Sequence, residues 1–168
     1  MTVTRLTAAQ DLARALPLRA LPLRALLAAA ALLLGAHALA AGDLSGQTPV
    51  EVKVELGDAK DGMRFVPDRI QLETGKLYRL VLVNPSPQKH YFSSAGLADA
   101  VFTRKVQVNG ADGKPLAEVK GPVREIEVYP GATAEWWFVP VKAGTFGDLK
   151  CTIPGHEVRG MKGAIEVR

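Results

Sequence analysis

The chain carries near its C-terminus the stretch Cys151-Thr-Ile-Pro-Gly-His156-Glu-Val-Arg-Gly-Met161. A thiol, an imidazole and a thioether follow one another here at five-residue intervals on one short segment. Thiolate and thioether sulfurs are soft, polarizable ligands and imidazole is a borderline one, a combination that suits copper and disfavours Mg²⁺ or Ca²⁺. The stretch therefore predicts a copper-binding loop.

A fourth ligand is expected from the segment Asn84-Pro-Ser-Pro-Gln-Lys-His90, which holds the only other histidine after residue 40. Two histidines, one cysteine and a weakly bound methionine are the ligand set of blue-copper electron-transfer centres. We predict that His90, Cys151, His156 and Met161 hold a single type 1 copper ion. Because His90 is distant in sequence from the other three, only the folded domain can complete such a site. No catalytic residues are predicted.

Each of these residues also has an ordinary structural explanation when it is taken alone. Cysteine is often a small buried residue, histidine a hydrogen-bonded group, and methionine a filler of the core. The joint order and spacing favour ligation. Cys151 is also the only cysteine, so it has no partner for an internal disulfide. Met63 is the remaining sulfur after residue 40, and we expect it to pack in the core.

The sequence after residue 50 alternates apolar and polar residues in short runs separated by turn residues, which is the period of strands with one buried face. The runs are 50–55, 70–73, 80–83, 125–128, 134–141, 146–151 and 163–167. We predict an all-β domain, a two-sheet Greek-key β-sandwich. Strand parity points Cys151 into the domain together with Leu149, and one of Trp136 and Trp137 should also point inward.

The alternation weakens over residues 94–122. Residues 96–102 could form a helical turn or two, and Asn109-Gly110 with Asp112-Gly113 marks a turn-rich tip. We expect a partly helical or turn-rich insertion that hangs off the sandwich.

The N-terminal residues 1–40 have the pattern of an export signal. Four arginines precede an Ala- and Leu-rich stretch, and Ala38-Leu-Ala40 provides small residues for cleavage. Residues 41–49 would form a short linker and 50–168 the copper-binding domain. An uncleaved leader that acts as an anchor is the alternative. Cleavage would remove four arginines and one aspartate and leave 17 basic and 16 acidic residues, a net charge of +1. This balance argues against nucleic-acid binding.

The chain resembles the cupredoxins, the small blue-copper proteins, and in particular those of the azurin, auracyanin and plastocyanin type. The resemblance rests on CTIPGHEVRGMKG at 151–163, on the segment 84–90, and on Tyr129-Pro-Gly131 and Ala143-Gly-Thr-Phe146 in the expected order. It implies that His90, Cys151 and His156 are equatorial ligands and Met161 the axial one. It also implies single-electron transport between larger redox proteins.

Two positions depart from the azurin pattern. Tyr91 follows His90 where azurin-like members commonly have an asparagine that ties the ligand segments together. Lys89 precedes His90 where azurins have a glycine whose carbonyl approaches the copper, so we expect four ligands rather than five.

The function that these residues favour is a soluble periplasmic electron carrier, not an enzyme, and a monomer in its mature form. Its partners would be redox proteins such as a cytochrome or a copper enzyme. The main alternative is a copper-binding protein for delivery, buffering or resistance, although no Met-rich or His-rich tract is present. A metal-free interaction module is the third possibility. The basic residues close in sequence to the ligands could steer an acidic partner; these are Lys89, Lys150, Arg159 and Lys162.

Other metal centres fit the sequence less well. A binuclear copper centre of the oxidase type needs two cysteines, and multicopper oxidases need many more histidines. Structural zinc sites use four cysteine or histidine ligands, and this chain offers three such residues plus a thioether.

Overall fold

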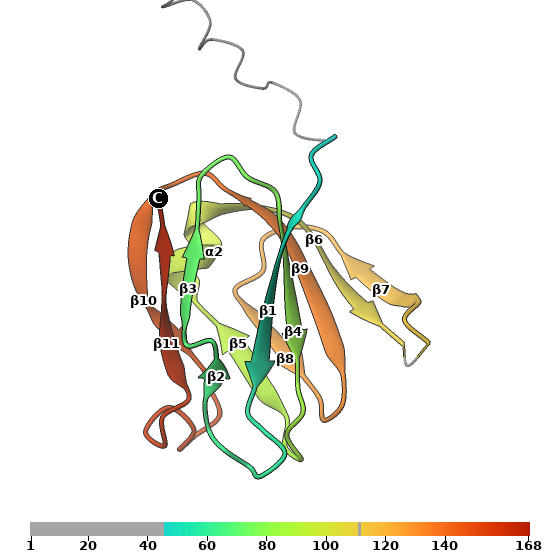
Figure 1. The fold of residues 1–168 in the computed structure, drawn as a ribbon, viewed down its shortest axis with the longest axis vertical. Helices are drawn as coiled ribbons and strands as arrows, with labels where there is room; N and C mark the ends of the chain where they lie inside the picture. The colour runs from blue at the N-terminus through green and yellow to red at the C-terminus, as the bar shows by residue number, and fades with distance from the viewer. Residues whose placement is uncertain (1–45, 111) are drawn as a thin grey trace, which may run out of the picture. The chain divides into compact units, whose positions relative to one another are not determined.

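A computed structural model describes residues 46–110 and 112–168 of the chain (Figure 1). The predicted leader at 1–40 and most of the linker at 41–49 lie outside the described residues. Within the described ranges the domain is two β-sheets packed against each other with one short helix, α2 (Ala95–Ala100). No helix in this part of the chain is long and apolar enough to cross a membrane. The predicted all-β, two-sheet sandwich is confirmed.

The first sheet contains six strands among the described residues. In spatial order they are β2 (Phe65–Val66), β1 (Val50–Leu56), β4 (Tyr78–Val83), β9 (Thr133–Pro140), β6 (Val101–Asn109) and β7 (Pro115–Val119). Strands β1 and β4 are parallel, and the other neighbouring pairs are antiparallel. Strand β7 therefore forms one open edge of this sheet.

The second sheet contains five strands of the described residues. Their order is β3 (Arg69–Leu72), β11 (Lys162–Val167), β10 (Gly144–Lys150), β5 (His90–Ser93) and β8 (Glu125–Val128). Strand β10 lies between β11 and β5. The strand that precedes Cys151 is therefore flanked by the strand that begins at His90 and by the strand that follows Met161.

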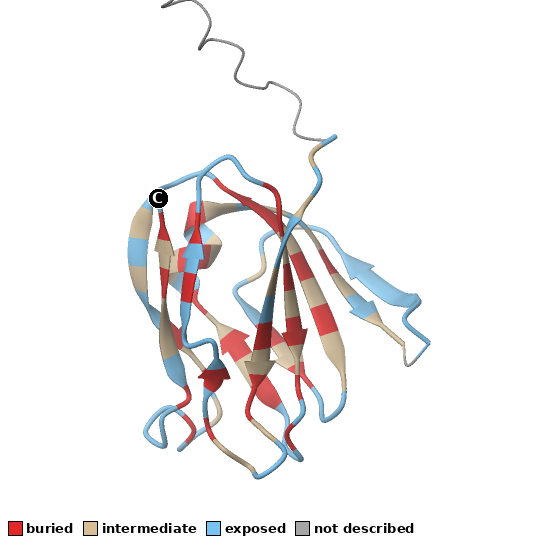
Figure 2. Ribbon diagram, in the orientation of Figure 1, coloured by how far each residue is buried: buried red, intermediate tan, exposed pale blue. Residues whose placement is uncertain are grey.

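The core forms where the inner faces of the two sheets meet (Figure 2). Alternate residues of the central strands are buried there, as period-2 alternation predicts. Trp136 is 1% exposed and packs against Phe138, whereas Trp137 faces outward and is half-buried. Leu149 and Cys151 are both buried. The predicted inward orientation of one tryptophan and of Cys151 is confirmed.

The region 94–122 is more regular than expected. The helical turn is present as α2, which begins after Ser94, whose hydroxyl accepts a hydrogen bond from the Leu97 amide at 3.2 Å. Most of the remainder forms the hairpin of β6 and β7. Because β6 pairs with β9 from Val101 to Val108, it is an inner strand of the sheet, and the expectation of an insertion hanging off the sandwich was wrong for this part. The alternation is weak because every residue of β7 is exposed.

Candidate metal centre

Two loops at one end of the sandwich, the lower end in Figure 1, bring the four predicted ligands together. His90 is the first residue of β5, directly after the loop that follows β4. Cys151 follows the last residue of β10, and the turn that leads to β11 carries His156 and Met161. Strand ends thus fix the thiol and one imidazole, and a tight loop provides the second imidazole.

The potential ligand atoms of His90, Cys151 and His156 converge on one point. The two imidazole Nδ1 atoms are 3.2 Å apart, and Cys151 Sγ lies 3.4 Å from His156 Nδ1 and 4.0 Å from His90 Nδ1. For a first-row metal with bonds of about 2.0 Å to nitrogen and about 2.3 Å to sulfur in a trigonal plane, the two nitrogens would be about 3.5 Å apart and each would lie about 3.7 Å from the sulfur. The three residues therefore have the spacing that one bound metal ion requires.

All four predicted ligands are buried: His90 is 0%, Cys151 1%, His156 6% and Met161 0% exposed. Burial is the main cause that lowers the pKa of His90, and the neighbouring His156 lowers it further. Burial, followed by Arg159, lowers the pKa of His156. Both imidazoles are thus held in the neutral form that binds metal.

No protein-family model matches the chain. It is 32% identical over 110 residues to the copper-resistant cuproprotein CopI of Rubrivivax gelatinosus, and the match covers 64% of this chain and 62% of that protein. Among solved structures, the McoA multicopper oxidase of the hyperthermophile Aquifex aeolicus gives a TM-score of 0.53 at 18% identity, over 74% of this chain and 32% of the oxidase. Auracyanin B gives a TM-score of 0.47 at 20% identity, over 76% of this chain and 95% of auracyanin B.

The chain has the cupredoxin fold. The buried His90, Cys151, His156 and Met161 fit a single type 1 copper ion. Because this fold also occurs in multicopper oxidases and in a copper-containing nitrite reductase, the fold by itself does not separate an electron carrier from an enzyme.

The orientation of His90 in the cupredoxin domain is set by a hydrogen-bonded chain that the sequence did not reveal. His90 Nε2 lies 3.0 Å from Ser86 Oγ, which leaves Nδ1 directed at the other ligands. The Ser86 amide donates to Asn84 Oδ1 at 2.9 Å. Asn84 Nδ2 in turn donates to the carbonyls of Gln88 at 2.7 Å and Val128 at 2.8 Å. The signal was present as Asn-Pro-Ser-Pro, because Asn and Ser side chains commonly bond the backbone two residues on.

The loop after β1 packs closely against the imidazole of His90. Gly57 has a φ of +75°, and a Cβ placed there would lie 2.8 Å from His90 Nε2 and 2.8 Å from the Ser86 Cβ. Asp61 on this loop accepts a hydrogen bond from Gln88 Nε2 at 2.9 Å and lies 3.9 Å from Arg159 Nη2. A third loop thereby contacts both ligand-bearing loops.

Backbone groups make the hydrogen bonds that join Cys151 to the other ligand-bearing segments. The Tyr91 amide donates to Cys151 Sγ at 3.4 Å, so the backbone connects the two ligand segments where azurins use an asparagine side chain. The Cys151 amide donates to the Met161 carbonyl at 3.1 Å, and the Met161 amide donates to the His156 carbonyl at 3.0 Å. These bonds hold the ends of the loop together.

Two further expectations concern residues near the ligands. Met63 is 7% exposed and belongs to the hydrophobic core, as expected. Of the basic residues around the loop, Lys89 pairs with Glu127 at 2.7 Å and Lys150 with Glu157 at 3.2 Å. Arg159 lies near Asp61, as described above. Most of this positive charge is therefore neutralised locally, which weakens the hypothesis of a basic rim.

Proposed function

We propose that the chain is a periplasmic type 1 copper protein that carries single electrons between larger redox proteins. His90, Cys151 and His156 are the equatorial ligands in this proposal, and Met161 is the axial one. The single observation that carries it is the convergence of His90 Nδ1, Cys151 Sγ and His156 Nδ1 in a buried position. Copper bound there supplies a one-electron couple between Cu(II) and Cu(I).

The surroundings of the ligands suit electron transport because they are fixed. Ser86 orients one imidazole, Gly57 packs so closely against it that a Cβ would clash, and backbone hydrogen bonds close the 151–161 loop. A protein that holds its ligands in one arrangement opposes the rearrangement that would slow electron exchange. In this proposal His156, which is 6% exposed, is the most solvent-exposed of the four ligands.

Export and partners follow from the same proposal. The leader pattern at 1–40 supports cleavage and a periplasmic location, and the partners would be redox proteins such as a cytochrome or a copper enzyme. The chain functions as a monomer in this view, without catalytic turnover of its own.

A second candidate is a role in copper resistance, which the relationship to the cuproprotein CopI favours. Such a protein would use the same ligands but would release the metal readily. The match spans only 62% of CopI, so part of that protein has no counterpart in the aligned region.

The test is an absorption spectrum of the copper-loaded protein beside its Cys151→Ser variant. An intense visible thiolate-to-copper band is expected in the first and should be lost in the second, since serine cannot supply the thiolate. Absence of the band from both would overturn the type 1 assignment. Electron self-exchange and copper loss to a mild chelator then separate the candidates, because slow exchange with rapid loss would favour resistance.

A further inference from the structure

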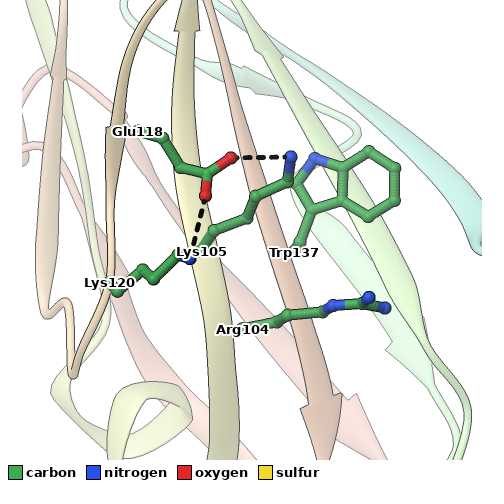
Figure 3. Close-up of a pocket in the computed structure, with 5 residues that line it drawn as sticks. All are labelled: Arg104, Lys105, Glu118, Lys120 and Trp137. Atoms are coloured by element: carbon green, nitrogen blue, oxygen red, sulfur yellow. Dashed lines mark hydrogen bonds and ion pairs between the residues drawn. The ribbon is translucent and has the colours of Figure 1, made fainter. Parts of the chain in front are cut away.

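A hollow of about 350 Å³ lies on the outer face of the first sheet, where β6, β7 and β9 run side by side (Figure 3). Its lining contains three cations, one carboxylate and one aromatic ring: Arg104, Lys105, Lys120, Glu118 and Trp137. None of these residues belongs to the proposed copper site. The hollow is therefore a separate surface feature of the domain.

A bulge in β6 directs two adjacent cations into this hollow. The pairing of β6 with β9 shifts register between Thr103 and Lys105, so Arg104 is an extra residue in the strand. Thr103 still faces inward, where its hydroxyl accepts a hydrogen bond from Trp136 Nε1 at 3.1 Å. Bulges re-aim side chains in this way. Figure 3 shows Arg104 and Lys105 both reaching toward Trp137.

The hollow has an excess of positive charge. Lys105 Nζ and Lys120 Nζ share one carboxylate, that of Glu118, at 3.0 and 3.5 Å. Arg104 makes no ion pair with any of the described residues. Lys105 is also held 5.0 Å above the centre of the Trp137 ring and donates to Gln107 Oε1 at 2.7 Å. The lining therefore carries two more positive than negative charges, beside a ring whose Nε1–H donates to Glu135 at 2.9 Å.

The composition of this face is that of a protein-binding surface. Trp and Arg are the residues most enriched among side chains that dominate interface energies. Phe102, which precedes the bulge on β6, is 65% exposed. In contrast, most of the basic residues around the copper loop are paired with acidic neighbours. Steering of an acidic partner therefore fits this face better than the copper end.

We propose that this hollow docks an acidic redox partner protein by receiving one of its surface carboxylates against Arg104, beside Trp137. An arginine fork binds a carboxylate with two parallel hydrogen bonds, and an adjacent ring shields that pair from water. The inference rests on the proposed electron-carrier function, because it assigns a surface to the partner of that function. The inference also places the docking position of the partner protein away from the copper loop.

The test is an NMR titration of the isotope-labelled, Cu(I)-loaded protein with hexaglutamate at low salt. The indole N–H of Trp137 and the backbone amides of β6 and β7 should shift. The variant Arg104→Glu/Lys120→Glu should bind about tenfold more weakly, because interface charges contribute strongly at low ionic strength. A control with the same net charge, Arg69→Glu/Lys142→Glu, replaces two exposed cations that have no ion pair within the described residues, and its affinity should stay within about twofold.

Three outcomes would overturn the proposal: shifts centred on residues 151–162, equal weakening by the control pair, or binding to phosphatidylglycerol vesicles but not to hexaglutamate. If the charge-reversed pair fails to fold, Arg104→Gln/Lys120→Gln provides the same comparison with a smaller perturbation. Peptide binding does not depend on the visible copper band. A missing band with a positive titration therefore rejects the carrier function alone, and a normal band with a flat titration rejects the docking site alone.

Discussion

The copper end of the domain and the hairpin of β6 and β7 contain similar polar residues, but these residues are buried at the copper end and more exposed in the hairpin. At the copper end Asn84 and Ser86 are 0% and 2% exposed and are hydrogen-bonded to buried groups. Every residue of β7 is exposed, and Asn109 at the end of β6 is half-buried and donates a hydrogen bond to the half-buried Glu135. A buried polar group has no water to replace a lost partner, whereas an exposed one does. Matched substitutions in the two regions should therefore lower the free energy of unfolding by very different amounts.

The largest contrast is expected between Asn84→Ala and Asn109→Ala. The first leaves two carbonyls and the Ser86 amide without partners, and we expect it to lower the free energy of unfolding by about 3 kcal/mol. The second removes hydrogen bonds to Gln107 and Glu135 that water can replace, and its cost should be about 0.5 kcal/mol. Urea unfolding of the copper-free proteins with a common m-value measures both. Equal costs would show that the copper end is not the more tightly bonded region.

A second contrast uses two glycines with the same backbone conformation. Gly57 has a φ of +75° and Gly113 one of +76°, but an added Cβ at Gly57 meets His90 and Ser86 whereas one at Gly113 meets no described residue within 4 Å. Replacement by alanine should lower the free energy of unfolding by about 1 kcal/mol at either position, because a residue with a Cβ is strained in the left-handed conformation. At Gly57 the clash of the new Cβ with His90 and Ser86 should lower the free energy of unfolding by about 2 kcal/mol more.

Copper spectra provide an independent measure for this pair. Gly57→Ala should shift the visible band because it displaces His90, and Gly113→Ala should leave the band unchanged. An unshifted band in a folded Gly57→Ala protein would mean that the loop after β1 does not constrain the imidazole.

The sequence predicted the site better than it predicted the groups that orient it. Soft ligands at fixed spacing have few structural alternatives, so Cys151, His156 and His90 could be grouped before any fold was known. The role of Ser86 could not be predicted, because it depends on how the loop turns at two prolines. The place of β6 in the sheet was missed because Val106 is its one buried residue and its partner β7 is wholly exposed, so neither strand shows the alternation of a strand with one buried face.

The third contrast compares two hydroxyls that contact ring nitrogens, the buried one of Ser86 and the half-buried one of Thr103. Ser86 lies against His90 Nε2, and Thr103 accepts from Trp136 Nε1. Ser86→Ala and Thr103→Val should each lower the free energy of unfolding by about 1.5 kcal/mol. Only Ser86→Ala should change the copper absorption band and the reduction potential, because only Ser86 contacts a proposed ligand. Equal spectral changes in the two variants would indicate a general loosening of the sandwich rather than an orienting role for Ser86.

The smallest effect concerns Asp148, which connects the two regions. Its carboxylate accepts hydrogen bonds from the Gly96 amide and the Ser94 hydroxyl, each at 2.7 Å, and so ties α2 to β10, the strand that Cys151 follows. Burial acts to raise the pKa of Asp148, but the hydrogen bonds from Gly96 and Ser94 outweigh it and the net pKa is lowered. The carboxylate therefore contributes stability that is present above the unfolded pKa of about 3.9 and is lost as pH falls through the lower folded value.

Asp148→Asn should accordingly lower the free energy of unfolding by about 0.5 kcal/mol at pH 7, a small value because the side chain is largely exposed, and by less at pH 2. Urea unfolding measured between those two values, beside Asp112→Asn at the tip of the hairpin, isolates the contribution of this carboxylate. A cost that persists unchanged at pH 2 would mean that the geometry of the side chain, and not its charge, holds α2 against β10. In that case the hydrogen-bonding position of the side chain would be enough to hold the contact, and ionisation of Asp148 would have no part in it.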